Sequence, residues 1–254
     1  MNKGLNNLRT LRVVGTILFT IGIVLGVVIF GLITWAKLES FFFFSNDYRA
    51  DQPYLSVVCP KVMTFSETKP VVVTLDNSSK TAISPPVQVY ISHHGFFRVI
   101  QAKASLAPKQ KQTLHWEVSA DDIAMGHLVI VKVYVYPTAE LKPRSGTCGI
   151  LVVDMPGLSG NQVLALGLGL CGLCLAAWAS IWFFLTGALN KRLPDTTSEM
   201  VTITVVVLLG IITSLMGAWV ISVVLLIIAV FLIGTPILRT IRRIYYKIRN
   251  KIIE

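Results

Sequence analysis

Two cysteines carry the sharpest chemical signal in this chain. Cys171 and Cys174 stand three residues apart inside a long apolar stretch. Residues at this spacing share one face of a helix, so the two thiols would form a pair within the membrane if the stretch crosses a bilayer. Such a dithiol can cycle between reduced and oxidised forms, which defines one hypothesis, a membrane thiol oxidoreductase. Cysteine is also small and readily buried, and no basic residue stands nearby to favour the thiolate, so helix packing is the favoured interpretation.

The other two cysteines indicate a structural bond. Cys59 and Cys148 fall in the first and last of a series of short predicted strands, which often lie close together in a β-sandwich. A disulfide is permitted outside the cytoplasm. We therefore predict a Cys59–Cys148 disulfide, with two buried free thiols as the alternative.

The four histidines occur in the same segment of the chain as this cysteine pair. His93 and His94 precede Gly95 in a predicted turn. A protein metal site needs three or four ligands, and no carboxylate or cysteine stands at ligand spacing beside these two imidazoles. The sequence also shows no phosphate-binding loop and no nucleophile–base pair. We therefore predict no metal, no cofactor and no catalytic residue apart from the low-ranked thiol pair.

The triplet at residues 77–79 has two interpretations. Asn77-Ser78-Ser79 fits a glycosylation acceptor, which would place it on an exposed loop outside the cell. Asparagine and serine in this order also form Asx turns, and that common local structure is the favoured interpretation.

The elements that must position these residues are mostly apolar. Of the 254 residues, 54% are hydrophobic and 14% charged, against roughly 45–50% and about 25% in soluble domains. This composition excludes a disordered chain and favours a membrane protein. Uncharged blocks occur at residues 13–36, 163–189 and 200–238. A span needs about 20 residues at about 1.5 Å each, so the third block is long enough for two helices, predicted at 200–215 and 218–238.

The positive charges give an orientation to these predicted spans. Lys and Arg accumulate in the N-terminal residues 1–12, in the loop 190–199 and in the tail 239–254. Such clusters gather in short cytoplasmic flanks of membrane helices. Four spans put all three clusters, and both termini, on the cytoplasmic side of the plasma membrane. The net charge of +10 then reports orientation rather than nucleic-acid binding, and the first block is predicted to be an uncleaved signal anchor.

The C-terminal tail is predicted to be an amphipathic helix. Isoleucines recur at helical spacing on one face, and basic side chains occupy the other. The basic residues are Arg239, Arg242, Arg243, Lys247, Arg249 and Lys251. We expect this helix to lie on the inner leaflet and to attract its anionic lipids.

Residues 37–162 differ from the rest because short β-rich runs alternate with turn signals. Strands are predicted at 55–59, 71–75, 87–92, 96–103, 113–118, 128–136 and 147–154. The run at 128–136 is the clearest, since Val131, Val133 and Val135 alternate with other side chains as in a half-buried strand. About seven short strands without a long helix favour an antiparallel sandwich.

Several runs in this segment suggest a family. Residues 72–79 (VVTLDNSS), 87–90 (VQVY), 106–116 (LAPKQKQTLHW) and 119–126 (SADDIAMG) resemble bacterial immunoglobulin-like modules of the cell-adhesion-related type. In that family a strand ends in a polar turn, and a leucine–x–proline turn leads into another strand. The resemblance covers at most half of the chain and implies an Ig-like fold more than any activity.

Small residues predict how the helices pack. Gly22 and Gly26 form a GxxxG pair in the first predicted span, while Gly172, Ala176 and Ser180 recur at every fourth position in the second. Such stripes let helix backbones approach closely, either within the protein or against another membrane subunit. The predicted spans contain no ionisable side chain, which argues against a pump or coupled transporter.

Together these patterns predict four transmembrane helices with an extracytoplasmic all-β Ig-like sandwich between the first and the second. The segments are a cytoplasmic N-terminus (1–12), helix 1 (13–36), the sandwich (37–162), helix 2 (163–189), a cytoplasmic loop (190–199), helix 3 (200–215), helix 4 (218–238) and a basic tail (239–254). The favoured function is non-enzymatic, an accessory or assembly subunit or a binding module, with protein and lipid partners but no nucleic acid. The alternatives are the thiol oxidoreductase and a channel or lipid transporter.

Overall fold

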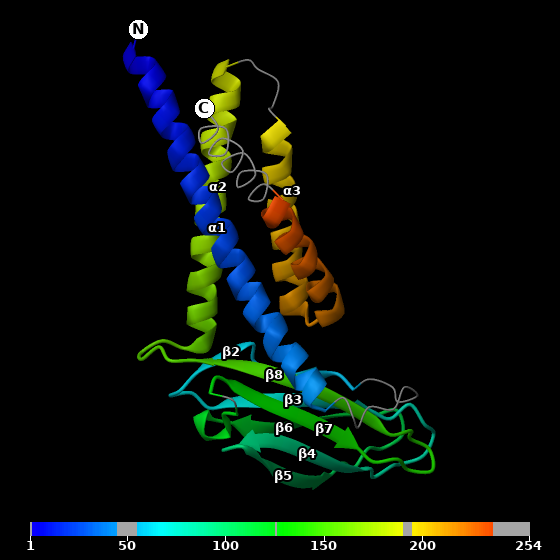
Figure 1. The fold of residues 1–254 in the computed structure, drawn as a ribbon. Coiled ribbons are helices and arrows are strands. Elements are labelled where there is room, and N and C mark those ends of the chain that lie inside the picture. Colours follow the sequence, from blue (N-terminus) through cyan, green and yellow to red (C-terminus); the bar gives the residue numbers. More distant parts are fainter. Residues whose placement is uncertain (1, 45–54, 125, 190–194, 236–254) are drawn as a thin grey trace, which may run out of the picture. The chain divides into compact units, whose positions relative to one another are not determined.

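The computed structural model describes residues 2–44, 55–124, 126–189 and 195–235. It contains two compact units, which are treated separately below. A sandwich unit comprises Leu32–Ala165, and a helical unit comprises Met1–Gly31 and Leu166–Glu254. Two long helices, α1 (Asn2–Phe43) and α2 (Gly160–Leu189), contribute residues to both units (Figure 1).

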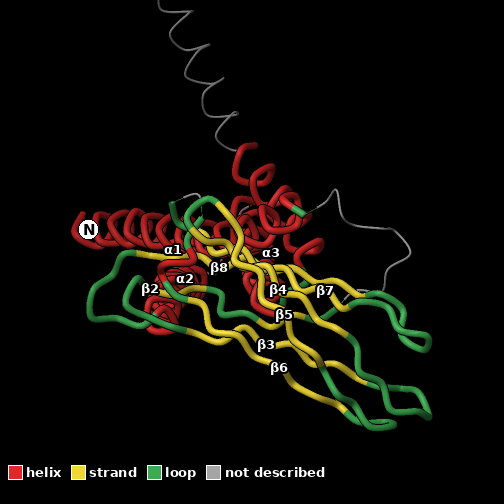
Figure 2. The backbone as a smooth tube through the Cα atoms, turned by 90° about the horizontal axis from the view of Figure 1, so that it is seen from below, coloured by secondary structure: helices red, strands yellow, loops and turns green. Residues whose placement is uncertain are grey.

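The sandwich unit consists of two β-sheets. The five-stranded sheet has the order β2-β8-β7-β4-β5, and the three-stranded sheet has the order β1-β3-β6. The strands are β1 (Val57–Val58), β2 (Val62–Thr64), β3 (Lys69–Asp76), β4 (Pro86–His93), β5 (Phe96–Lys103), β6 (Lys111–Val118), β7 (Leu128–Val135) and β8 (Arg144–Val153). Figure 2 shows β3 and β6 as one layer and β7, β4 and β5 as the other.

Most of the strand pairs are antiparallel, with one exception. Strand β2 pairs with β8 in parallel, with Val62 opposite Leu151 and Thr64 opposite Val153. The first predicted strand, 55–59, is the short β1, and β2 was missed because a run of three residues carries almost no periodic signal.

The core between the sheets follows the alternation of the sequence. Val129, Val131 and Val133 of β7 are fully buried against the partner sheet, and Val71 and Val73 face them from β3. The prediction that β7 is half-buried is wrong, however. Leu128, Ile130 and Lys132, on the opposite face of β7, are buried too.

The end of α1 explains why β7 is buried on both faces. Ala36 and Phe44 form a second small core with Leu128 and Ile130 on the outer face of the five-stranded sheet. The last turns of α1 are therefore a third layer on the sandwich. Sequence periodicity could not reveal this layer, because a strand covered on both faces loses the polar half of its alternation.

The helical unit corrects the predicted fold class. The β-rich region follows α1, and α2, α3 (Asp195–Met216) and a shorter apolar helix, Trp219–Thr235, come after it. Among the described residues, three helices are long and apolar enough to cross a membrane, at Thr10–Phe43, Gly160–Leu185 and Ser198–Met216. The expectation of four spans is therefore wrong. The chain turns at Gly217, with φ of 81°, and the described part of the helix beyond it, Trp219–Thr235, is about 26 Å long, less than the roughly 30 Å core of a bilayer.

Three candidate spans also remove the reason for placing both termini in the cytoplasm, since that inference needed an even number of crossings. The loop residues 190–194 and the basic tail from Arg239 to Lys251 lie outside the described residues. Helix boundaries differ from the predicted ones as well: α1 is 42 residues long and continues past the expected end at residue 36.

Candidate functional site

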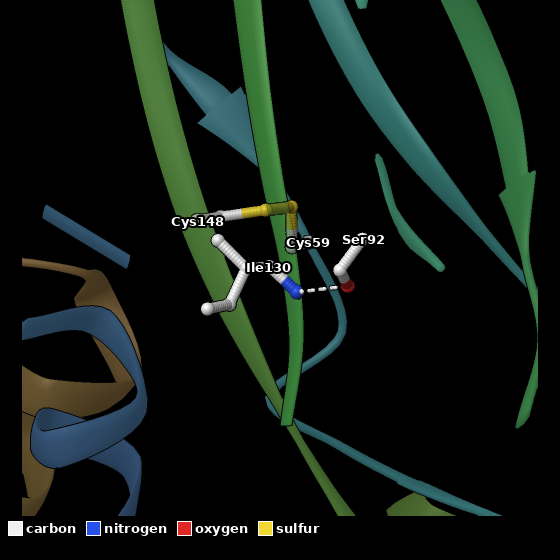
Figure 3. Close-up of a disulfide and its surroundings, with 4 residues drawn as sticks. All are labelled: Cys59, Ser92, Ile130 and Cys148. Carbon is white, nitrogen blue, oxygen red and sulfur yellow. Dashed lines mark hydrogen bonds between the residues drawn. A yellow bond between two sulfur atoms is a disulfide. The ribbon is translucent and has the colours of Figure 1, made fainter. Parts of the chain in front are cut away.

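Cys59 and Cys148 form a disulfide in the sandwich unit. Their Cα atoms lie 6.4 Å apart, and 89 positions of sequence separate them. The bond joins the segment between β1 and β2 to the middle of β8, and the half of it contributed by Cys148 is buried in the core (Figure 3). It connects the two ends of the sandwich sequence and so restricts the unfolded chain over most of the domain.

Figure 3 also shows a side chain that completes the sheet where the backbone ladder stops. The β4–β7 pairing ends at Ile91 and Val131. Beyond it, the backbone N–H of Ile130 donates to Ser92 Oγ at 2.9 Å, and this hydroxyl donates to the carbonyl of Asp122 at 2.5 Å. The buried serine thus replaces one ladder hydrogen bond and holds the 3-10 turn η2 (Ala120–Asp122) against the sheet.

The carboxylate of Asp122 is the hydrogen-bond acceptor for the polar groups around this turn. Its side chain is almost fully buried and accepts hydrogen bonds from the backbone N–H of Ser119 at 3.0 Å and from the Arg98 guanidinium at 3.1 Å. Nδ1 of His93 lies 3.6 Å from the other carboxylate oxygen, beyond hydrogen-bond distance. The arrangement is a structural ion pair that fixes η2 to β5.

In the described part of the chain, the histidine pair has no third side chain beside it that could complete a metal site. The rings of His93 and His94 lie 4.5 Å apart at the β4–β5 turn, where His94 has φ of 44° and Gly95 has φ of 85°. His115 lies on β6, in the other sheet, opposite Val72. Among the described residues, no group of three His, Cys, Asp or Glu side chains could hold a metal ion.

Asn77 forms an Asx turn. Its side-chain oxygen accepts hydrogen bonds from the backbone N–H and the hydroxyl of Ser79, and its amide nitrogen donates to the carbonyls of Thr81, Leu106 and Ala107. The residue is buried, with 1% of its surface exposed. An amide held in this way cannot be reached by a glycosyl-transferring enzyme in the folded domain.

The first attachment of a helix to the sandwich is a close backbone contact. Gly149 of β8 faces α1, and a Cβ atom placed on it would clash with the carbonyl of Ala36 and lie 3.2 Å from the backbone nitrogen of Lys37. Only glycine permits this approach. Further along, Lys132 is buried with its ammonium over the ring of Phe44 at 4.9 Å, and Phe97 packs on Phe44 at 5.3 Å.

The second attachment is made by Glu67, in the turn between β2 and β3. One carboxylate oxygen accepts hydrogen bonds from the backbone N–H groups of Thr64 and Gly160, both at 2.8 Å. The other lies 3.2 Å from the ammonium of Lys69, which also donates to the side chain of Asn161 at 3.3 Å. Because Gly160 is the first residue of α2, this carboxylate satisfies an N–H at the start of the helix.

The electrostatics of Glu67 follow from these partners. Burial by itself would raise the pKa of its carboxyl group, but the hydrogen bonds from Gly160, Thr64 and Lys69 and the charge of Lys69 lower it below the ordinary value. The carboxylate is therefore ionised at neutral pH and stabilises the junction between the sandwich and α2.

In the described part of the sandwich, each sheet ends in an eight-residue edge strand, β6 beside β3 and β5 beside β4, and of the two only β5 carries exposed large apolar groups. In the part of the chain that the structure describes, β5 pairs with β4 alone. Most of its side chains are exposed, and Phe96, with 80% of its surface accessible, and Val99 are large apolar groups. At the end of the strand, Gln101, Lys103 and Tyr136 line a shallow depression on the surface. An exposed eight-residue edge strand is a template for pairing with another chain.

In the helical unit, the predicted thiol pair lies in a helix interface. Cys171 and Cys174 are buried free cysteines, and Cys171 donates to the backbone carbonyl of Gly22 at 3.2 Å. A Cβ atom on Gly22 would lie 3.2 Å from Cβ of Cys174, and one on Gly26 would lie 3.3 Å from Sγ of Cys171. The GxxxG pair of α1 therefore packs on the cysteine face of α2.

The other small-residue stripe faces outward. Gly172, Ala176 and Ser180 are exposed on α2, and a Cβ atom on Gly172 would meet nothing within 4 Å. The described part of the helical unit therefore uses one stripe for its own packing and leaves the second uncovered.

Comparisons with known proteins give likenesses of fold for part of the chain. No protein-family model matches it, and no curated protein sequence does. A CARDB domain from Pyrococcus furiosus, crystallised in complex with di-metal ions, is 18% identical, and the match covers 42% of this chain and 95% of that domain at a TM-score of 0.32. Red sea bream transglutaminase is 13% identical over 44% of this chain and 18% of its own, also at 0.32. The matches thus include the cell-adhesion-related class that the turn motifs resemble.

Two residues that attach helices to the sandwich were not predicted from the sequence. Glu67 is one acidic residue in a polar turn, and Gly149 is one glycine in a predicted strand. A glycine within a strand can mark a close backbone approach, so Gly149 carried a usable signal. Glu67 carried none, because its partner lies 93 positions away.

Proposed function

We propose that this protein is an integral membrane protein whose Ig-like sandwich is an interaction module, acting as an accessory or assembly subunit or a binding module of a membrane complex. Three apolar helices of spanning length support the membrane part of the proposal. The described faces of these helices carry exposed large hydrophobic groups, such as Val28 on α1, Leu173 on α2 and Ile212 on α3. Lipid is the solvent in which such surfaces are stable.

The open edge of β5 carries the interaction part of the proposal. Its backbone pairs on one side only within the described residues, and its outward side chains mix apolar and basic groups. An extended segment of another protein can add a strand there, with main-chain hydrogen bonds giving affinity and side chains giving specificity. The attachments at Gly149 and Glu67 support this role, because they hold the sandwich firmly on the ends of α1 and α2.

The experiment has two separate readouts. Resistance of the protein to extraction from membranes by alkaline carbonate tests whether it is integral. Photoreactive amino acids at Val99 on β5 and at Lys80, in an exposed loop, then test the edge in intact membranes. We expect one defined adduct at Val99 that maps to β5, is lost in Gln101→Pro and is absent at Lys80. A chain that forms no adduct on β5 and stays monomeric in mild detergent would contradict the proposal.

The thiol oxidoreductase gains no support from the site. Cys171 donates to the carbonyl of Gly22 and is packed against α1, and the other two cysteines, Cys59 and Cys148, form a disulfide within the sandwich. Buried cysteines in a helix interface are typical of packing.

A further inference from the structure

Two lysines flank β8 on the sandwich unit, between the places where α1 and α2 attach to it. The backbone of Lys37 lies against Gly149, because a Cβ atom on that glycine would be 3.2 Å from the Lys37 nitrogen. The carbonyl of Lys61 accepts a hydrogen bond from the N–H of Leu151 at 3.1 Å. Gly149 and Leu151 are two positions apart on β8, so the backbone of Lys37, over the face of the strand, and that of Lys61, along its edge, are neighbours.

The two ammonium groups are close enough for the charge of Lys61 to repel that of Lys37. Both side chains are half-buried. In the ion pairs of the described residues, no carboxylate lies within 4.0 Å of either ammonium. Glu39 follows Lys37 by two positions and so lies on another face of α1, while Glu67 is held by Lys69.

A half-buried pair of like charges is unfavourable without an anion. Burial lowers the pKa of Lys61, which shows that its surroundings oppose the charge it carries at neutral pH. An anionic group between the two ammonium groups would reverse this effect, because each nitrogen would gain a charged hydrogen-bond partner.

The surroundings of the pair favour a lipid as the source of that anion. Trp35, with 57% of its surface accessible, precedes Lys37 on α1 at the predicted end of the first span. Phe65 and Met155 are exposed and follow the paired residues Thr64 and Val153 at the edge where α2 begins. Exposed aromatic and apolar groups beside lysines are typical of the interface between headgroups and acyl chains.

We propose that Lys37 and Lys61 bind the phosphate of an anionic phospholipid in the leaflet that α1 and α2 enter beside the sandwich. This site rests on the proposed function, since it requires both helices to cross a membrane. It is distinct from the predicted contact of the C-terminal tail with the inner leaflet, because it lies on the sandwich unit. The two ammonium groups contact the phosphate, and Phe65 contacts the glycerol and upper acyl region, while Trp35, on another face of α1, lies at the same depth in the membrane interface.

The test uses the full-length protein in mild detergent with a phosphatidylglycerol that carries a photoactivatable headgroup. We expect crosslinks on the peptides containing Lys37 and Lys61, and occupancy about 30-fold lower in the double variant Lys37→Gln, Lys61→Gln, from about fivefold for each lysine. The double variant Lys80→Gln, Lys142→Gln removes two exposed lysines and is the matched control, expected to keep full occupancy. Crosslinks to the tail peptide serve as an internal standard in all three proteins.

Competition distinguishes the sources of the phosphate. Unlabelled phosphatidylglycerol should displace the probe, whereas phosphatidylcholine and inorganic phosphate should not. Displacement by inorganic phosphate at similar concentrations would make this a free-anion site and overturn the proposal, as would undiminished crosslinking in the Lys37→Gln, Lys61→Gln protein. Failure of the membrane assignment appears separately, as release of the protein by alkaline carbonate.

Discussion

Replacing Glu67 tests whether one carboxylate joins the sandwich to the start of α2. Glu67→Ala removes the acceptor for two buried backbone N–H groups, those of Thr64 and Gly160. An unsatisfied buried donor costs about 1–3 kcal/mol. Because the Glu67 side chain is 17% exposed and water can reach part of the site, we expect a loss of about 2–4 kcal/mol in the free energy of unfolding.

Glu67→Gln tests the charge of this side chain, because glutamine keeps its shape. Glutamine keeps one acceptor oxygen but loses the charge in both hydrogen bonds and the ion pair with Lys69. A hydrogen bond to a charged group contributes about 1.5–3 kcal/mol and a neutral one about 0.5–1.5 kcal/mol. Over two hydrogen bonds the difference is about 2–3 kcal/mol, and water at the partly exposed carboxylate reduces the expected loss to about 1–2 kcal/mol, smaller than for alanine.

The pH dependence has a definite sign. The pKa of Glu67 is lower in the folded protein than its ordinary value of 4.5, so the unfolded chain binds the proton more readily. The stabilisation is fully present above the unfolded value and is lost as the pH falls through the folded one. The difference in melting temperature between wild type and Glu67→Gln should accordingly be largest at neutral pH and should shrink below about pH 4.5.

Amide hydrogen exchange at the first turn of α2 measures the local effect. A loss of about 2 kcal/mol in local stability makes exchange at Gly160 and its neighbours about 30-fold faster in Glu67→Ala. Glu140→Gln is the matched control, since this exposed carboxylate accepts a hydrogen bond from Thr81 and touches no helix. If exchange at Gly160 is equally slow in wild type and Glu67→Ala, the carboxylate does not hold α2.

Three other substitutions test the packing. Gly149→Ala forces a Cβ atom into the Ala36 carbonyl and should lower the free energy of unfolding of the sandwich by about 3 kcal/mol or more. The control Gly172→Ala, whose Cβ atom meets nothing within 4 Å, should have the same melting temperature in detergent as the wild type. Cys148→Ser should lower the free energy of unfolding by about 4–5 kcal/mol, because the disulfide closes a loop with a separation of 89 positions. The reduced wild type should have the same melting temperature as this variant. A variant as stable as the oxidised protein would refute a stabilising disulfide. Gly26→Ile brings a Cβ atom within 2.7 Å of Val207 and should open the helix interface. Alkylation of Cys171 by a maleimide should then become faster than in wild type or in the control Gly169→Ala, whose Cβ atom meets nothing within 4 Å. An unchanged alkylation rate would contradict the described packing.

The local patterns of the sequence determined a large part of this protein. Valine alternation at 129–135 specified an inward face, because a strand must bury one side, and uncharged blocks specified helices, because a bilayer excludes charge. Small residues at Gly22 and Gly26 marked a helix interface for the same local reason. The third block does divide at Gly217, as the sequence predicted, but the count of spans failed because the described helix beyond that turn, Trp219–Thr235, is shorter than the predicted 218–238.

What only the tertiary structure decided are the contacts between residues distant in the chain. The end of α1 covers the sheet because Gly149 leaves room for the Ala36 carbonyl. The first N–H of α2, at Gly160, is bound by the carboxylate of Glu67, 93 positions earlier in the chain. Lys37 and Lys61 become neighbours only through β8. Periodicity reports which face of an element is buried, whereas the identity of the group that buries it depends on how separate elements meet in space.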